Sequence, residues 1–224
     1  RAFGIVAQSI GGGGGVGGAS HSGSLLSVSV GGRGGSSGDG AAVSVTLASG
    51  SQISTAGDGA HGVVAQSIGG GGGIGGDASG PNYSFRGIKG SDSATGEGHD
   101  VTVTAEGTIR TTGTRAHGIV AQSVSGGGGI VGDRTGISYG ANTSQGGTAQ
   151  TSGKVTIGQA GSIATTGFES IGILAQSSAG ARPGEVDISI DGDVTGGTGS
   201  NGAGVMILQS GPSAVYINQG AVVS

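Results

Sequence analysis

The chain lacks cysteine and tryptophan, and it has few aromatic or charged residues. Of its 224 residues, 3% are aromatic and 10% are charged, and the formal net charge is −4 at pH 7. The missing cysteines exclude a disulfide framework and thiol catalysis. The weak negative charge provides no basic surface for nucleic acid or an anionic membrane. No apolar run approaches the roughly 20 residues that a membrane-spanning helix needs.

Glycine is the residue that the chain has in excess, with 58 copies. Each glycine costs about 0.5–1 kcal/mol relative to alanine when it is ordered in regular structure. Full disorder is one alternative, because chains rich in glycine and serine usually behave as flexible linkers. Against it stand the 33% hydrophobic residues, with valine and isoleucine gathered in short alternating runs. We therefore expect a fold in which a repeated structure offsets the cost of ordering glycine.

One motif recurs along the chain: an apolar segment, then Gln-Ser, then a run of glycines. Its copies are GIVAQSIGGGGG at 4–15, GVVAQSIGGGGG at 62–73 and GIVAQSVSGGGG at 118–129. A shorter copy ends at Ser177, and a looser one, GVMILQS, ends at Ser210. The steps between copies become regular when each repeat is divided into a core and an insertion. The cores span 43–67, 101–123, 155–177 and 186–210, and the long insertions span 10–42, 68–100 and 124–154.

Each core contains three short strand signals separated by glycine-containing corners. The first signal alternates apolar and polar residues, as in VSVTL from residue 43, which places its valines on one face. The second has one aliphatic residue expected to be buried, and the third is the motif segment itself. The expected core residues are Ile5, Val43, Val45, Ile53, Val63, Val101, Val103, Ile109, Ile119, Val155, Ile157, Ile163 and Ile173.

Three strands in 23 to 25 residues predict one turn of a parallel β-helix, or β-solenoid, and hence an all-β chain. Each turn should rise by one strand spacing, about 4.8 Å. A single turn cannot bury its own apolar face, so we expect about five to six stacked turns to share one continuous core. Residues 1–224 are expected to be a single segment of this kind, a fragment of a longer repeat array, with long glycine-rich insertions at one corner.

The ends of the motif strands are expected to stack as side-chain ladders. In parallel in-register stacking, each glutamine amide can bond the next one. The glycine runs at 11–15, 69–73 and 126–129 are expected to lie beside one another as an ordered layer, because a residue without Cβ allows sharp turns and close approach. The predicted ladder residues are Gln8, Gln66, Gln122, Gln176, Ser9, Ser67, Ser123 and Ser177.

The sequence indicates no chemical site. GGSSG at 34–38 matches the nucleophile-elbow pattern, but chance matches are expected in a chain so rich in glycine and serine. His61 and His117 precede the motif glycine in two copies and apolar residues replace them elsewhere, so structural histidines are expected. We predict no catalytic residue, no metal site and no cofactor. Local Asx turns are expected at four acids in glycine-flanked corners: Asp39, Asp58, Asp191 and Asp193.

Most of the few aromatic residues lie in the insertions or near corners. Variable loops on a rigid scaffold tend to bear recognition, so the insertions are the expected binding surface. Docking of the same side chains against the coil is an equally open alternative. The residues proposed for binding are Leu25, Leu26, Tyr83, Phe85, Arg86 and Tyr139.

A consensus of the motif, HGIVAQSIGGGGG, set between V-x-V and G-x-I-x-T-x-G strands, resembles the glycine-rich passenger repeats of bacterial autotransporters. These are large surface proteins secreted by the type V route, and the resemblance covers essentially the whole chain. It implies a right-handed parallel β-helix that a C-terminal translocator barrel carries across the outer membrane, often for adhesion. Membrane contact is expected only through such a translocator, which these residues do not include. The resemblance transfers no catalytic residue, because the matched positions belong to the scaffold.

We therefore expect a structural and adhesive stalk outside the cell, at a bacterial surface, and not an enzyme. Its insertions are expected to bind a host or surface ligand, protein or glycan, or sister chains, with no nucleic-acid partner. One alternative is a self-assembling extracellular filament subunit, because unpaired edge strands are templates for stacking. Another is a β-helix enzyme acting on glycans, or a phage-type tailspike, which needs an acidic cleft at Glu97, Asp100 or Glu185.

Overall fold

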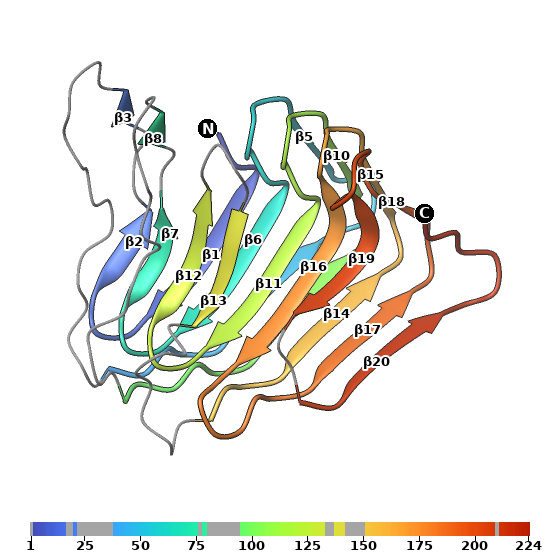
Figure 1. Cartoon of the computed structure of the whole chain (residues 1–224). Helices are drawn as coiled ribbons and strands as arrows, with labels where there is room; N and C mark the ends of the chain where they lie inside the picture. The colour runs from blue at the N-terminus through green and yellow to red at the C-terminus, as the bar shows by residue number, and fades with distance from the viewer. Residues whose placement is uncertain are drawn as a thin grey trace.

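The computed structural model describes residues 2–16, 20–21, 38–75, 78–79, 95–132, 137–141, 151–208 and 211–224. The described residues form β-strands and no helix, so this part of the chain is all-β. Most strands lie in parallel sheets whose order follows the sequence repeats from the blue N-terminal end to the red C-terminal end (Figure 1).

Three parallel sheets each receive one strand from successive repeats. The motif sheet contains the Gln-Ser strands in the order β1 (Ile5–Ile10), β6 (Val63–Ile68), β11 (Ile119–Val124), β16 (Ile171–Ser178) and β19 (Ala203–Leu208). The valine sheet contains the alternating strands β4 (Val43–Leu47), β9 (Val101–Ala105), β14 (Val155–Gln159), β17 (Val186–Ile190) and β20 (Ser213–Ile217). The corner sheet contains β5 (Gln52–Thr55), β10 (Thr108–Thr111), β15 (Ser162–Thr165) and β18 (Val194–Thr195).

Equivalent residues of successive repeats pair with one another. Ala65 pairs with Ala7 on one side and with Ala121 on the other. Val101 likewise lies between its equivalents in β4 and β14. A slip of one residue would turn every inward side chain outward, so burial of the apolar face fixes this register.

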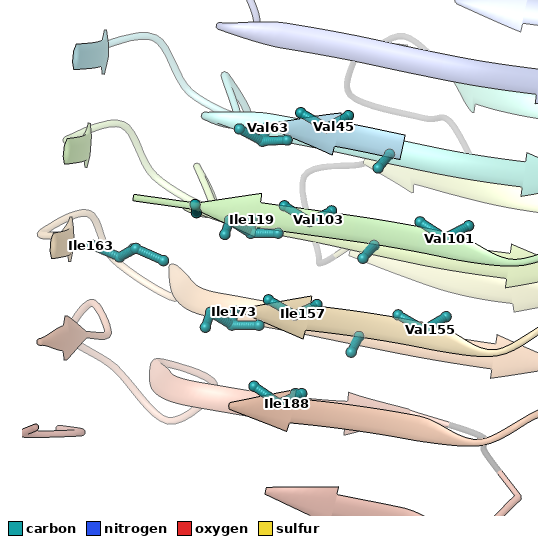
Figure 2. Packing of buried hydrophobic residues seen from close by; sticks show 14 of the residues in the cluster. Val45, Val63, Val101, Val103, Ile119, Val155, Ile157, Ile163, Ile173 and Ile188 are labelled. Carbon is teal, nitrogen blue, oxygen red and sulfur yellow. The ribbon is translucent and has the colours of Figure 1, made fainter. Parts of the chain in front are cut away.

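The main hydrophobic core is formed by the inward residues of these three sheets. Figure 2 shows them in rows, one for each repeat, in which residues of the valine sheet and of the motif sheet lie side by side. Ile5 and Ile53 are only partly buried, because they lie in the edge strands β1 and β5. The other expected core residues are buried in this cluster: Val43, Val45, Val63, Val101, Val103, Ile109, Ile119, Val155, Ile157, Ile163 and Ile173.

A second hydrophobic cluster, which was not predicted, lies on the opposite face of the motif sheet. The alternate residues Val64, Val120 and Leu174 are fully buried there. They pack with Ile74 and Ile130, which follow the glycine runs. β6, β11 and β16 are therefore buried on both faces, which is why they have continuous apolar residues instead of alternation.

The glycine runs form part of a further sheet, here called the glycine sheet, beside the motif sheet (Figure 1). Its order is β2 (Gly14–Val16), β7 (Gly72–Gly75), β12 (Gly128–Gly132) and β13 (Ile137–Ala141). The predicted glycine layer is confirmed where Gly72 pairs with Gly14 and Gly128. β13 departs from the pattern, because it runs antiparallel to β12. A small fifth sheet pairs β3 (Ser20–His21) with β8 (Ala78–Ser79).

Two positions show why the glycine sheet excludes larger residues. Gly72 and Gly129 have φ angles of +138° and +140°, which residues with a Cβ rarely adopt. A Cβ on Gly72 would lie 1.9 Å from the carbonyl oxygen of Gly128. A Cβ on Gly129 would lie 1.9 Å from the carbonyl oxygen of Gly73. Only bare backbone allows the strands to pair here.

The boundaries of the repeats differ from those predicted. β1, β6 and β11 continue to Ile10, Ile68 and Val124, so each insertion begins with the last residue of a motif strand. β20 also extends the valine sheet beyond the last predicted core, which ended at Ser210. The first part of each long insertion is therefore a covering layer on the motif sheet.

Candidate functional site

The residues proposed for binding lie largely outside the described part of the chain. This is the case for Leu25, Leu26, Tyr83, Phe85 and Arg86. The backbone of Tyr139 belongs to β13, where it pairs with Ile130. The described candidates are therefore the ladders and corners of the scaffold.

The four motif glutamines form a continuous hydrogen-bonded ladder. Gln8 Nε2 donates to Gln66 Oε1 over 2.5 Å, and Gln66 Nε2 donates to Gln122 Oε1 over 2.5 Å. Gln122 Nε2 donates in turn to Gln176 Oε1 over 2.6 Å. Alternation along the strand places these amides on the face of Val64, which the glycine sheet covers. The last three glutamines are fully buried, and the amides supply one another with the partners that buried polar groups require.

The motif serines pair in register but bond differently from the prediction. Their side chains lie on the inner face of the motif strand. Each Oγ accepts a hydrogen bond from a backbone N–H in the segment that leads into a strand of the valine sheet. These bonds run from Ala41 N to Ser9 Oγ (2.7 Å), from His99 N to Ser67 Oγ (2.8 Å), from Gly153 N to Ser123 Oγ (2.9 Å) and from Gly184 N to Ser177 Oγ (2.9 Å). The serines thus close one corner of each repeat instead of forming a hydroxyl ladder.

His61 and His117 form a buried stack. Their ring centroids are 4.8 Å apart at an interplanar angle of 7°, and the ring of Phe3 stacks on His61 at 5.5 Å. His117 N donates to His61 Nδ1 over 3.0 Å, and Ile171 N donates to His117 Nδ1 over 2.9 Å. A ring nitrogen that accepts an N–H is unprotonated, so these bonds require the neutral imidazole with its proton on Nε2. Each ring joins its own repeat to the next one.

Burial lowers the pKa of His117 to about 3. A histidine in the unfolded chain has a pKa near 6.5. Between these two values the unfolded chain binds a proton that the folded chain does not bind. The contribution of His117 to stability is therefore complete above about pH 6.5 and is lost as the pH falls towards 3.

We expect acidification below about pH 6.5 to reduce the free energy of unfolding by about 1.4 kcal/mol per pH unit through His117. The variant His117→Phe should depend less steeply on pH, because it removes this proton-binding difference. Urea unfolding of both proteins at several pH values between neutrality and about pH 4 measures the two slopes. Equal slopes would show that His117 does not contribute to the pH dependence.

The acids expected to form local Asx turns bond the next repeat instead. Successive repeats lie about 4.8 Å apart, so a corner carboxylate reaches an N–H or amide group of its neighbour. Asp191 Oδ1 accepts from the side chain of Asn218. The other bonds run from Glu97 N to Asp39 Oδ1 (2.8 Å), from Thr114 N to Asp58 Oδ1 (2.9 Å) and from Val222 N to Asp193 Oδ1 (3.2 Å).

The acids considered for a catalytic cleft each have a partner. Within the residues that the structure describes, no group of three His, Cys, Asp or Glu side chains could hold a metal ion. The contacts are Thr151 N to Glu97 Oε1 (3.3 Å), Lys154 N to Asp100 Oδ1 (2.8 Å) and Lys154 Nζ to Glu185 Oε2 (3.3 Å).

One corner with an ion pair between repeats was not predicted from the sequence. Arg115 and Glu169 have φ angles of +52° and +54°, and Arg115 Nε lies 2.9 Å from Glu169 Oε2. The backbone bonds between repeats place them in line with Gly59 and Gly199. The available signal was the alignment of the cores, in which this position is Gly, Arg, Glu and Gly in successive repeats.

No family model matches the chain, and comparison with curated proteins and with solved structures found no match. Among the described residues, no helix has the length and apolar character needed to cross a membrane. Function is therefore inferred from the chain's own geometry.

Proposed function

We propose that the chain is a segment of a right-handed parallel β-helix, a β-solenoid, and serves as a structural and adhesive stalk of a secreted bacterial surface protein. The observation that supports this most strongly is the pairing of equivalent residues in three parallel sheets around one core. In such an array each repeat contacts only its neighbours, so added repeats increase length at constant cross-section. That geometry suits a spacer.

The side-chain bonds between repeats suit the same role. Glutamine, histidine and aspartate each link one repeat to the next, so polar bonds supplement the backbone ladders at several points of the cross-section. The chain has no cysteine, so its folding outside the cell requires no oxidation. Repeats that stack on their predecessors can also fold in order as the chain emerges from the membrane.

The adhesive role is assigned to the insertions, which leave the scaffold after the motif strands. The proposed partners are a host or surface ligand, protein or glycan, or sister chains, at the outside of a bacterial cell reached across the outer membrane. Nucleic acid is not a proposed partner, and no catalysis is assigned to the chain.

Duplication of residues 101–154 tests the architecture. Each added repeat should lengthen the particle by about 4.8 Å and leave its cross-section unchanged. Small-angle scattering gives both the maximum dimension and the cross-sectional radius for chains with zero, one and two added repeats. A particle that grows in cross-section instead would contradict the solenoid.

Replacement of residues 22–37 or 81–94 by short Gly-Ser linkers tests the adhesive role. Both variants should keep the circular dichroism of the parent chain, because the described strands lie outside these segments, and should lose binding to immobilised extracellular-matrix proteins. The unmodified chain is the reference, and glycan turnover is measured in the same samples. Adhesion that survives both replacements would show that the insertions are not the adhesive surface. Turnover of a glycan would favour the alternative of a glycan-active β-helix enzyme.

A second candidate function is assembly into filaments. Val215, Ile217 and Val222 are 40%, 54% and 59% exposed, and β20 is the edge strand of the valine sheet. An exposed apolar edge is a template for another strand. Light scattering should then show association that rises with concentration and that Ile217→Lys suppresses, whereas a monomer at all concentrations would exclude assembly.

A further inference from the structure

The corner that follows β15 has an exposed aromatic side chain. Phe168 is 52% exposed and is one of three phenylalanines in the chain. The backbone of Phe168 forms an isolated parallel β-bridge with Thr198 of the next repeat. A Cβ on Gly199 would lie 2.7 Å from the Cε2 atom of the Phe168 ring. The ring therefore rests on the bare backbone of Gly199. The missing side chain below it lets the ring lie against the corner while half of its surface faces solvent.

Polar groups from three successive repeats meet at Glu169, the residue that follows Phe168 in the chain. Glu169 Oε2 lies 2.9 Å from Arg115 Nε, and Asn201 Nδ2 donates to Glu169 Oε1 over 3.0 Å. Asn201 is exposed, and no hydrogen bond within the described residues occupies its amide oxygen. The positive and negative charges of Arg115 and Glu169 compensate each other. The corner therefore presents an aromatic ring and oriented polar groups with no net charge from this pair.

The backbone at this corner is strained where its neighbours are not. Arg115 and Glu169 adopt left-handed φ angles at the position that Gly59 and Gly199 occupy in the adjoining repeats. The left-handed conformation is unfavourable for a residue with a Cβ, so both residues are held in a strained backbone. A partly exposed ion pair contributes little to stability and does not offset that strain. Strain of this kind is typical of binding and catalytic sites.

We propose that the corner formed by Arg115, Phe168, Glu169 and Asn201 binds a neutral carbohydrate. An aromatic ring can pack on the C–H face of a sugar, while amide, carboxylate and guanidinium groups bond its hydroxyls. The inference goes beyond the proposed function, because it adds a carbohydrate-binding place on the scaffold, apart from the insertions.

Titration calorimetry with neutral hexasaccharides tests the site. The probes are the hexamers of β-1,4-glucose, α-1,4-glucose and β-1,4-N-acetylglucosamine, added to the whole chain. The chain should bind at least one of them, and Phe168→Ala should weaken that binding at least tenfold. Tyr216→Ala is the matched control, because Tyr216 is an exposed aromatic residue of β20 on another sheet and its loss should leave binding unchanged.

The double variant Arg115→Gly with Glu169→Gly separates binding from folding. Glycine adopts the left-handed angles without strain, so this variant should melt at the same temperature as the parent chain or higher and still lose binding at least tenfold. Failure of the chain to bind any of the three probes, or binding that both sets of substitutions leave intact, would overturn the proposal. The linker replacements leave all four residues in place, and the duplication keeps Phe168, Glu169 and Asn201 with a copy of Arg115 in the repeat before them. The outcome of those experiments therefore separates a failure of this site from a failure of the stalk.

Discussion

Replacement of Gln122 by methionine should lower the free energy of unfolding by about 2–6 kcal/mol. The methionine side chain has a similar length but cannot continue the amide ladder. Gln66 Nε2 loses its acceptor and Gln176 Oε1 loses its donor, in a region where both side chains are fully buried. Each buried polar group left without its partner costs about 1–3 kcal/mol. Urea unfolding followed by circular dichroism gives the difference.

Gln8→Met is the matched control for this experiment. Gln8 lies at the end of the ladder in the edge strand β1, is partly exposed and makes one bond, to Gln66. Its replacement affects one ladder bond in a place that water can reach, so the loss should be clearly smaller. Equal losses at the two positions would mean that the ladder bonds are not the source of the stability.

Replacement of Gly129 by alanine should cost more than about 4 kcal/mol, the range of exceptionally destabilising substitutions. The new Cβ would lie 1.9 Å from the carbonyl oxygen of Gly73, at a φ of +140°. Because backbone atoms form the obstacle, relief requires that β12 move away from β7. The second hydrophobic cluster would then be exposed at Ile130 and Val120. Hydrogen exchange should show lost protection in β7 and β12 in addition to the lower stability.

Gly158→Ala should give the opposite result in a strand of the valine sheet. Gly158 lies in β14, and a Cβ built there meets no atom within 4 Å. Alanine should stabilise the chain by about 0.5–1 kcal/mol, because it reduces the backbone freedom of the unfolded state. A loss of stability at Gly158, or an unaffected chain after Gly129→Ala, would show that close backbone contact is not what selects glycine in the glycine sheet.

The strands and their register could be predicted because two periodicities coincide. Alternation in VSVTL selects the inward face of β4, and the repeated Gln-Ser motif aligns each strand with its equivalent. The second hydrophobic cluster could not be predicted in this way. Val64 and Val120 belong to unbroken apolar runs, which indicate burial on both faces but not the partner. That partner includes Ile74 and Ile130, and only the backbone path through the glycine run brings them back over the strand.

The corners were the least predictable part of the scaffold. Asp58 stands in a glycine-flanked corner that is typical of a local Asx turn, but its carboxylate bonds Thr114 of the next repeat. Local sequence rules compare only the near neighbours along the chain, whereas stacking brings a second set of N–H groups within reach. Arg115 and Glu169 were missed for the same reason, since their pairing depends on residues 54 positions apart.

The amide row has a direction as well as a length. From Gln8 to Gln176 every link has its Nε2 donor in the earlier repeat and its Oε1 acceptor in the later one. The bond dipoles therefore add, and each link polarises the next. Within the described residues the row begins with the acceptor oxygen of Gln8 and donates towards the later repeats, so its two directions are chemically unlike. If the amide of one glutamine were flipped, its NH2 group would face the NH2 group of a neighbouring glutamine. The orientation of each amide therefore depends on the orientation of all the others.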